Sequence, residues 1–500
     1  MKLIHSLKNL HGTYWFIILF FITYTASSFN VLKTPFHEIA DSAVNALQIH
    51  RAGQFKEMLG PYSRAEFHHF GPISFYYFSL MEKPLSFLSS IHRQHQLALI
   101  IINSIFLLIT TGILLRVLSD KRYVYLFLLT IFISLRPLGA DFFMDTWGPY
   151  ILLMPMFLFF SSLIPLCMGN YKYLLFTALA FTFMLHNHIG SISITIPLLL
   201  LALFHYYHNR INKGIQRKEI FFFLSSILLI LLLSIPPLIE EAMYKDGNIS
   251  KILYFIFQKK ASQKLIRVFP FIFNYYSEPL KFIGDFSGIW VLAVCWISSF
   301  PLKKRLNTPE YYLRRISIAG FIFYFIAASR INGDLFSYLL WHHYIIVASF
   351  YFMALLIPFQ YFLKMLEFNR EHNLQIFHVS WIALVLFLIV SYTRKPADYD
   401  NQAEVFMEFI KPQKGTYYKL YWDEQDLGQW TIAASFAIEM VRKGYSPCVE
   451  DNWLFMFPRD MKCAGNTVNV KLSTIDETNT FNSNNTLSYE YKKTRVIIKP

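Results

Sequence analysis

Long apolar runs recur along this chain of 500 residues and restrict what it can fold into. A helix needs about 20 apolar residues to cross a bilayer, where hydrocarbon offers no partners to backbone N–H and C=O groups. With 55% hydrophobic and only 16% charged residues, we predict an α-helical polytopic membrane protein with about eleven transmembrane helices. The runs, several of them short, lie at 13–32, 96–116, 122–136, 148–168, 172–186, 189–207, 219–238, 285–301, 316–329, 342–361 and 376–393.

The cationic residues gather in alternate loops between these runs. Their dense clusters lie at 120–122, 208–218, 301–315 and 363–372. Such loops are cytoplasmic by the positive-inside rule, so the tail is predicted outside. The excess of 46 Lys and Arg over 32 Asp and Glu is explained by these loops and by anionic lipids, and we expect no nucleic-acid partner. The first run is long and lacks a clean cleavage site, which favours an uncleaved anchor over a signal peptide.

The last part of the chain differs from the rest in composition. It mixes strand-like alternation with an amphipathic stretch around 427–443, so we predict a small soluble α/β domain over 396–500. Residues 1–395 then form the transmembrane domain. Its predicted outer loops with catalytic residues are 33–95, 136–150 and 239–285.

Four cysteines are divided between these two parts. Cys167 and Cys295 fall in apolar runs, where packing is their simplest role. Cys448 and Cys463 fall in the predicted outer domain, and we expect a disulfide between them because extracytoplasmic compartments are oxidising. Zinc is a poorer alternative, since neither a CxxC motif nor a nearby histidine pair accompanies them.

The first outer loop, 33–95, is too long for a simple connection. Its apolar positions at helical spacing are Ile39, Ala43, Val44 and Leu47. They predict an amphipathic helix on the membrane surface, with Asp41 partly desolvated beside the bilayer. The alternative is that Asp41 and Glu38 only solvate an exposed helix face.

The same loop contains the polar stretch GPYSRAEFHHFGPISFYY at 60–77, in which each Gly-Pro pair imposes a turn. The hydrogen-bonding side chains between the turns are Tyr62, Ser63, Arg64, Glu66, His68 and His69. Arg64 and the histidines could bind a phosphate. Alternatively, Arg64 pairs with Glu66 or extends to lipid headgroups, as most interfacial arginines do.

Ionisable side chains are almost absent from the predicted spans and gather in the outer loops. The later loops supply Asp141, Asp145, His188, Lys245 and Arg330. The simplest arrangement is one extracytoplasmic cavity lined by these groups. His186 and His188 at i, i+2 could hold a metal ion, but without a companion carboxylate at fixed spacing the pattern is weak.

The order of these motifs resembles the GT-C superfamily of integral-membrane glycosyltransferases. The resemblance rests on the aspartate of the first loop, GPYSR…HHFGP…FYY, the sequence DTWGP at 145–149, HNH at 186–188 and DGN at 246–248. Members use polyprenyl-phosphate sugars and include protein mannosyltransferase-like and aminoarabinose-transferase-like enzymes of bacterial inner membranes. Two features depart from the family pattern: Asp41 is not part of an Asp-Glu pair, and HNH replaces a commoner Gln-x-His.

The resemblance implies an inverting transfer of a hexose or pentose to an envelope glycan, lipid or protein on the outer face of the membrane. Asp41 matches the catalytic base, and Asp145, or else Asp141, matches the second acidic position. The expected substrate-binding residues are Tyr62, Arg64, His68, His69, His188, Lys245 and Arg330. No cofactor is certain, but a divalent metal ion is left open because some relatives use one.

Two other classes of protein remain as alternatives. The first is a lipid or glycan transporter or flippase of the cell envelope, and the second is a non-catalytic assembly subunit. Ion-coupled transporters usually keep ionisable groups at mid-membrane. Their scarcity in the predicted spans favours a transferase.

Overall fold

The computed structural model describes residues 12–211, 214, 216–258, 263–301, 307–367, 401–423, 428–474, 487–492 and 494–499. These fall into two compact units. The first unit comprises Met1–Phe29, Leu99–Ile235 and Gln258–Lys395, and the second comprises Asn30–Ala98, Pro236–Phe257 and Pro396–Pro500. The division between 395 and 396 is one boundary of the second unit, which also includes most of the first outer loop. The two domains expected from the sequence stay a prediction.

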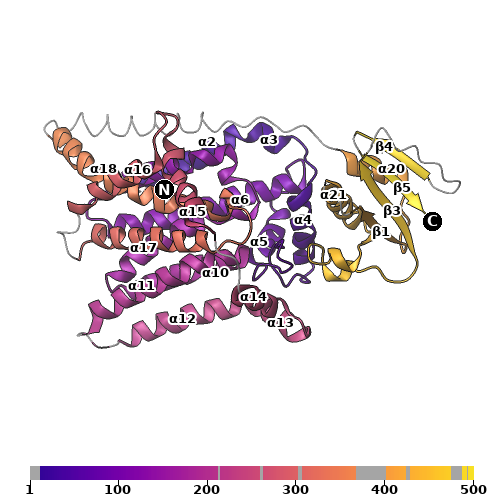
Figure 1. Cartoon of the computed structure of the whole chain (residues 1–500), viewed down its shortest axis with the longest axis horizontal. Coiled ribbons are helices and arrows are strands. Elements are labelled where there is room, and N and C mark those ends of the chain that lie inside the picture. The colour runs from indigo at the N-terminus through magenta and orange to yellow at the C-terminus, as the bar shows by residue number, and fades with distance from the viewer. Residues whose placement is uncertain are drawn as a thin grey trace, which may run out of the picture. The chain divides into compact units, whose positions relative to one another are not determined.

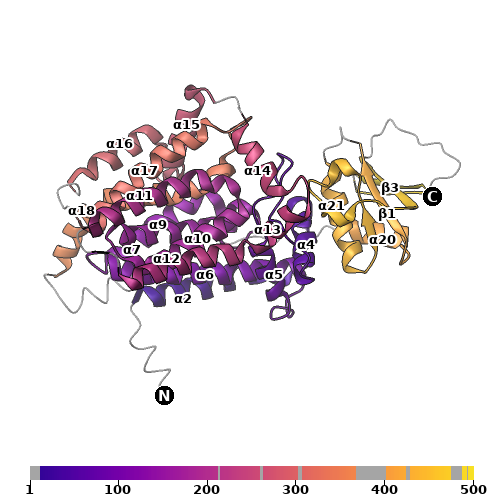
Figure 2. The same ribbon diagram turned by 90° about the horizontal axis from the view of Figure 1, so that it is seen from below.

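The first unit is a bundle of helices that run side by side along a common direction (Figures 1 and 2). Its α-helices are α2 (Gly12–Ser27), α6 (Ile91–Val117, whose first turns belong to the second unit), α7 (Tyr123–Leu135), α8 (Gly148–Ile151), α9 (Leu153–Cys167), α10 (Leu174–Asn187), α11 (Ile192–Arg210), α12 (Arg217–Leu233), α15 (Leu265–Ser277), α16 (Gly288–Ser298), α17 (Pro309–Ser329) and α18 (Tyr344–Glu367). Short 3-10 helices join them: η1 (Arg136–Phe143), η2 (Tyr171–Tyr173), η3 (Ile189–Ser191), η5 (Glu278–Leu280) and η7 (Ser337–His343).

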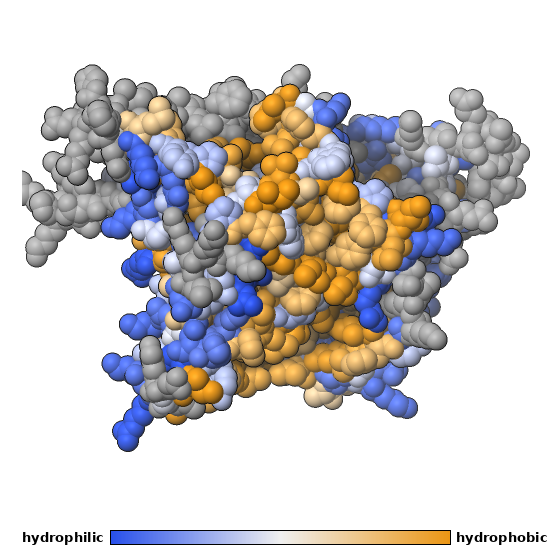
Figure 3. Space-filling view, turned by 60° about the vertical axis from the view of Figure 1, so that its left-hand side comes forward, coloured by the Kyte–Doolittle hydropathy of each residue, from blue (hydrophilic) through white to orange (hydrophobic). Residues whose placement is uncertain are grey.

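Helix α9 lies at the centre of this bundle. All 15 of its residues are buried, and it contacts α10, α11, α17 and α18. A helix that is apolar all round is typical of a protein interior or of a membrane span, and α9 is enclosed by its neighbouring helices. Helix α12, by contrast, leaves Phe221, Leu224 and Leu228 exposed. Figure 3 shows such apolar side chains over the middle of one face, the surface expected to contact lipid.

Among the residues that the structure describes, six helical segments are long and apolar enough to cross a membrane, or seven if a bent pair of helices is one span. The six are Ile91–Val117, Tyr123–Phe143, Gly148–Cys167, Ile189–Arg210, Pro309–Ser329 and Ser337–Met365, and the pair is Arg217–Leu233 with Ile235–Met243. The expected runs at 13–32, 172–186 and 285–301 form the shorter helices α2, α10 and α16. The expected run at 376–393 lies outside the described residues, so a count of eleven is not confirmed.

The second unit combines helices from three stretches of the chain with one sheet. Its helices are α3 (Phe29–Lys33), α4 (Ala40–Gly53), α5 (Ile73–Glu82), α13 (Ile235–Met243), α14 (Asn248–Phe257), α20 (Gln402–Ile410), α21 (Gln429–Arg442), η8 (Asp451–Trp453) and η9 (Arg459–Met461). Its strands are β1 (Tyr417–Trp422), β2 (Ser446–Cys448), β3 (Thr467–Thr474), β4 (Leu487–Tyr491) and β5 (Thr494–Lys499).

The strands form one sheet in the order β2-β1-β3-β5-β4. Strand β1 pairs in parallel with β2 and β3, whereas β5 pairs antiparallel with β3 and β4. Helix α21 connects the parallel strands β1 and β2, as parallel neighbours require. The predicted α/β segment is therefore confirmed.

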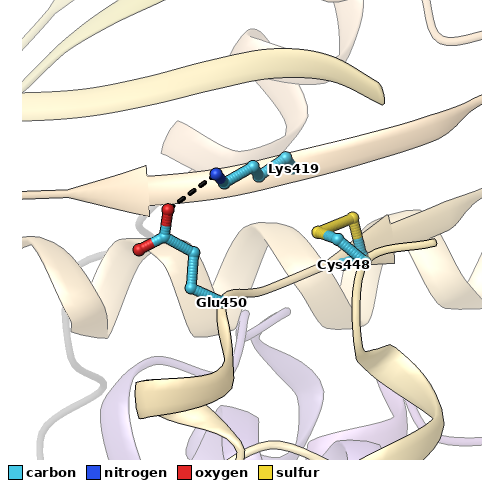
Figure 4. Close-up of a disulfide and its surroundings, with 4 residues drawn as sticks. Lys419, Cys448 and Glu450 are labelled. Carbon is cyan, nitrogen blue, oxygen red and sulfur yellow. Dashed lines mark ion pairs between the residues drawn. A yellow bond between two sulfur atoms is a disulfide. The ribbon is translucent and has the colours of Figure 1, made fainter. Parts of the chain in front are cut away.

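A disulfide joins the end of β2 to the loop after η9 (Figure 4). It links Cys448 to Cys463, the pair expected from the sequence, with their Cα atoms 4.9 Å apart. Beside it, Lys419 of β1 and Glu450 form an ion pair of 2.6 Å. These contacts hold the segment between β2 and β3 against the sheet.

Helix α4 of the first loop and helix α21 of the tail are neighbours (Figure 1). Their side chains belong to one hydrophobic core. Ala43, Val44 and Leu47 pack in the same cluster as Ala433 and Phe436. The prediction that this apolar face lies on the membrane surface is therefore wrong. The physical reason is that the small side chains of α21 allow α4 to approach closely and bury it against protein.

Candidate functional site

Residues 60–69 of the first loop fold back on themselves as a small antiparallel hairpin. The Gly60 N–H donates to the His69 carbonyl at 3.0 Å, and the His69 N–H donates to the Pro61 carbonyl at 2.7 Å. Tyr62 and His68 face each other across the hairpin in an antiparallel bridge. The chain reverses between these paired segments, where the Ser63 N–H donates to the Phe67 carbonyl at 2.8 Å and the Glu66 N–H donates to the Ser63 carbonyl at 3.1 Å. The turn therefore lies at residues 63–67 and not, as the sequence predicted, at either Gly-Pro pair.

Asp41 lies in the first turn of α4, half-buried, and accepts a hydrogen bond from the Tyr62 hydroxyl. The first turn of a helix favours a negative charge because backbone N–H groups point toward it. The Tyr62 ring also meets Phe455 of the tail, with centroids 6.3 Å apart. Two residues expected at the site are therefore joined, and the tail supports one of them.

Helix α4 meets the hairpin through a polar stripe. Asp41, Asn45 and Gln48 recur at i, i+4 and i+7, so they share one face of the helix. The Gln48 side chain, 2% exposed, donates to the Gly60 carbonyl at 3.0 Å. Gln48 was not among the residues expected at the site, although its spacing from Asp41 and Asn45 was the signal that could have identified it.

His68 is held at the base of the hairpin. Its Nδ1 lies 3.1 Å from the Gly60 carbonyl, which accepts the ring N–H in that tautomer. Burial lowers the pKa of His68 to about 4, so the ring is neutral at pH 7. His68 can therefore hydrogen bond to a ligand, but it does not supply the positive charge that a phosphate site needs.

Asn248, the last residue of the DGN motif, forms two hydrogen bonds with the backbone of His68. The Asn248 carboxamide accepts from the His68 N–H and donates to the His68 carbonyl, each at 2.8 Å. The Asn248 N–H in turn donates to Glu240, which pairs with Arg459 of the tail at 2.8 Å. Arg459 also covers the Tyr244 ring at 4.0 Å. Segment 236–257, which contains most of α13 and all of α14, thus links the hairpin to the tail.

Glu38 is only 2% exposed, so it does not solvate an exposed helix face. Arg442 of α21 donates to its two carboxylate oxygens, each at 2.8 Å. Burial alone would raise the pKa of Glu38, but the hydrogen bonds and charge of Arg442 outweigh it and lower the pKa to about 2. His37 stands 3.4 Å from both Glu404 and Glu439 of the tail. A network of charges therefore ties the start of the first loop to the tail.

A second polar group missed by the sequence analysis lies at the start of α6. His92, Arg93, Gln94, His95 and Gln96 are all buried. The Arg93 guanidinium donates to the Thr34 carbonyl at 2.9 Å and lies 4.9 Å from the Phe36 ring centroid. This polar run directly before an apolar run was the available signal.

The first unit contains Asp141 and Asp145, the two candidates for the second acidic position. The Asp145 N–H donates to the Asp141 carbonyl at 2.9 Å, so one turn brings the two residues together. The Asp145 carboxylate accepts the Trp147 N–H at 2.9 Å and orients the chain before α8. Both aspartates are half-buried.

Residues from three segments of the first unit meet around this turn. Trp147 packs against Trp341 of η7, with centroids 5.6 Å apart. A Cβ placed on Gly148 would lie 3.7 Å from the Asn187 carbonyl of the HNH motif. His188 follows directly in that motif. The structure therefore gathers Asp141, Asp145 and His188 in the first unit.

The remaining expected residues are less closely engaged. Arg64 is exposed near the tip of the hairpin, and Lys245 is exposed in segment 236–257. Arg330 is exposed at the end of α17, in the first unit. His69 is half-buried at the end of the hairpin, near the Phe67 ring. One group of expected residues in the second unit therefore comprises Asp41, Tyr62, His68 and His69.

Metal ligation was left open by the sequence. Within the described parts of the chain, no group of three or more His, Cys, Asp or Glu side chains is placed to hold a metal ion.

Solved structures resemble the whole chain. One is ArnT from Cupriavidus metallidurans bound to undecaprenyl phosphate, with a TM-score of 0.58 and 11% identity over 96% of this chain and 97% of that one. The same protein in the apo state gives a TM-score of 0.56 and 10% identity over 98% of both chains. An oligosaccharyltransferase from Archaeoglobus fulgidus matches at 0.47 and 13% identity, over 84% of this chain and 61% of that one.

No family model and no curated protein matches the chain. The chain has the GT-C fold, as the resemblance between motifs predicted.

Proposed function

We propose that this chain is a glycosyltransferase that moves a sugar from a polyprenyl-phosphate donor to a hydroxyl of an envelope glycan, lipid or protein. The main support for this proposal is the position of Asp41. Its carboxylate lies on α4 and accepts a hydrogen bond from Tyr62, which belongs to a hairpin of hydrogen-bonding side chains. The shared fold with ArnT, solved with undecaprenyl phosphate, supports a lipid-phosphate donor.

The transfer follows from the chemistry of these groups. A hydroxyl is a poor nucleophile, so Asp41 accepts its proton as the oxygen attacks C1 of the sugar. The bond from C1 to the phosphate oxygen breaks, and its electron pair leaves with the polyprenyl phosphate. Attack opposite to the leaving group inverts the configuration at C1. The hydrogen bond from Tyr62 orients the carboxylate, and this orientation lowers the entropic cost of reaching the reactive geometry.

The leaving phosphate needs positive charge and hydrogen-bond donors in a water-poor site. We propose Arg64 and Lys245 as cations, with His68 and His69 as hydrogen-bonding partners. Arg330 and His188 are the corresponding proposals from the first unit, and Asp145, or else Asp141, is the second acidic group. A divalent metal ion and the identity of the sugar, hexose or pentose, stay predictions.

The proposed location is the bacterial inner membrane, with the first loop and the tail on the extracytoplasmic side. The cationic loops on the opposite side support this orientation. The disulfide between Cys448 and Cys463 supports it independently, since such bonds persist in oxidising compartments.

The direct test is turnover by the purified chain in lipid nanodiscs. The substrate is a mixture of polyprenyl-phosphate sugars extracted from bacterial membranes, with envelope glycolipid as acceptor. We expect the loss of one lipid-linked sugar, release of polyprenyl phosphate and a matching mass gain in the acceptor. Transport of the intact sugar lipid across proteoliposomes without its consumption would instead support a flippase.

A further inference from the structure

Helix α14 presents two different faces. Asn248, Ile252 and Phe255 share the inner face at i, i+4 and i+7, and they meet the hairpin: Asn248 clasps His68, and the Phe255 and Phe67 rings lie 4.9 Å apart. The outer face carries large apolar side chains. Their exposed fractions are 48% for Leu253, 42% for Ile256 and 81% for Phe257.

This outer stripe is unusual for a helix in water. The helix has only 10 residues, too few for the roughly 20 that span a bilayer. Three large apolar side chains on one face of so short a helix mark a contact surface. Because its other face is fixed to the hairpin, the helix cannot bury the stripe by turning over.

The charge around α14 identifies what the surface contacts. Between residues 247 and 277 the sequence contains five cationic residues and no Asp or Glu. The five are Lys251, Lys259, Lys260, Lys264 and Arg267. By helical periodicity, Lys251 lies on the side of α14 away from the apolar stripe. The other four cationic residues follow the helix in the sequence. An apolar stripe on a helix that carries and is followed by cationic residues is typical of segments that lie in the interface of an anionic membrane.

The position of α14 in the chain agrees with a contact between this helix and an anionic membrane. It follows α12 and α13, which together pass the length and hydropathy test for a membrane span. These two helices are bent by 51° relative to each other, and Glu240 of α13 pairs with Arg459 of the tail. We therefore expect the chain to leave the bilayer between the end of α12 and the start of α14 at Asn248.

We propose that α14 lies in the interface of an anionic lipid bilayer, with Leu253, Ile256 and Phe257 at the acyl boundary and Lys251 toward the headgroups. Through Asn248 and Phe255 it then holds the hairpin at headgroup depth. The lipid contact stands by itself. Only its consequence, that the hairpin meets the phosphate of a lipid-linked donor at this depth, rests on the proposed function.

The depth of α14 can be measured without any assay of transfer. A chain with Cys167 and Cys295 replaced by alanine carries a fluorescent label at Phe257→Cys, in nanodiscs containing phosphatidylglycerol. We expect strong quenching by lipids with a nitroxide near the headgroup end of the acyl chain, and little quenching by aqueous iodide. The matched control is a label at Lys443→Cys, an exposed position of the tail, where iodide should quench and nitroxide lipids should not.

Two results would overturn the proposal. One is a label at 257 that iodide quenches as strongly as the label at 443. The other is stronger quenching by a nitroxide at the end of the acyl chain, which would mean that the segment is embedded in the hydrocarbon. Neither result depends on turnover, so failure here and failure of the transferase assay are distinguishable.

The charge contribution is tested with Lys251→Gln in the same labelled chain. One surface lysine changes affinity for an anionic membrane about fivefold. We expect a loss of that size in the lipid-quenched fraction with phosphatidylglycerol and no loss with phosphatidylcholine alone. An equal change in both lipids would overturn the preference for anionic lipid.

Discussion

Asp41→Asn is expected to lower kcat for sugar transfer at least about 100-fold, since positioned general bases commonly contribute a factor of 100 or more. The amide keeps the shape of the side chain and an oxygen to accept from Tyr62, but it cannot take the proton of the acceptor hydroxyl. KM for the lipid donor should change little, because the proposed donor contacts lie in other residues. The measurement is turnover of the lipid-linked sugar by the purified variant in nanodiscs.

The matched control is Glu66→Gln, which makes the same carboxylate-to-amide change at an exposed position of the same hairpin. Its turnover should stay near that of the wild type. Full activity of the Asp41 variant, at equal abundance and with unchanged donor binding, would remove the assignment of the base. Equal losses in both variants would point to a general disturbance of the hairpin.

Arg442→Ala should open the contact between the first loop and the tail. The change leaves the carboxylate of Glu38, 2% exposed, without the guanidinium that now binds both of its oxygens. Breaking a buried pair in this way costs about 3–5 kcal/mol. We therefore expect hydrogen exchange of the α4 and α21 amides to become about 150- to 5000-fold faster, with little change in α9.

The control for this prediction is Lys462→Ala, which removes a pair of 2.7 Å between side chains that are 59% and 69% exposed. Such a pair contributes less than about 1 kcal/mol, so exchange should change only slightly. Unchanged protection in the Arg442 variant would show that this network does not hold the two segments together.

The same ion pair gives a defined pH window. The pKa of Glu38 is lowered to about 2 from its ordinary value of 4.5. Its stabilisation, about 3 kcal/mol, is therefore fully present above pH 4.5 and is lost as the pH falls toward 2. Glu38→Gln should remove this part of the acid dependence of exchange in α21.

The general architecture was accessible from the sequence. Apolar length predicted α6, α9, α11 and α18 within a few residues, because a bilayer leaves few alternatives to long helices. The two Gly-Pro pairs predicted turns at the wrong places, since the hairpin reverses at residues 63–67 between them. The α/β character of the tail followed from alternating strands around one amphipathic stretch, now α21.

The tertiary contacts of these elements could not be predicted from the sequence. The apolar stripe of α4 fits a membrane surface as well as a protein surface, and only the fold reveals Ala433 opposite it. Asn248 lies 180 residues from His68, and no local pattern specifies such a pair. Likewise, the polar neighbours of Glu38 in the sequence suggest an exposed carboxylate. Its burial depends on the ion pair with Arg442, which lies far away in the tail.

The most direct test of the account is mass spectrometry of envelope glycans and polyprenyl-phosphate sugars from cells with Asp41→Asn, compared with wild type at matched protein abundance. The account predicts that one sugar disappears from a glycan, lipid or protein while its polyprenyl-phosphate form accumulates. An unchanged profile of both the acceptors and the lipid-linked sugars, in cells without a second enzyme for the same transfer, would contradict it.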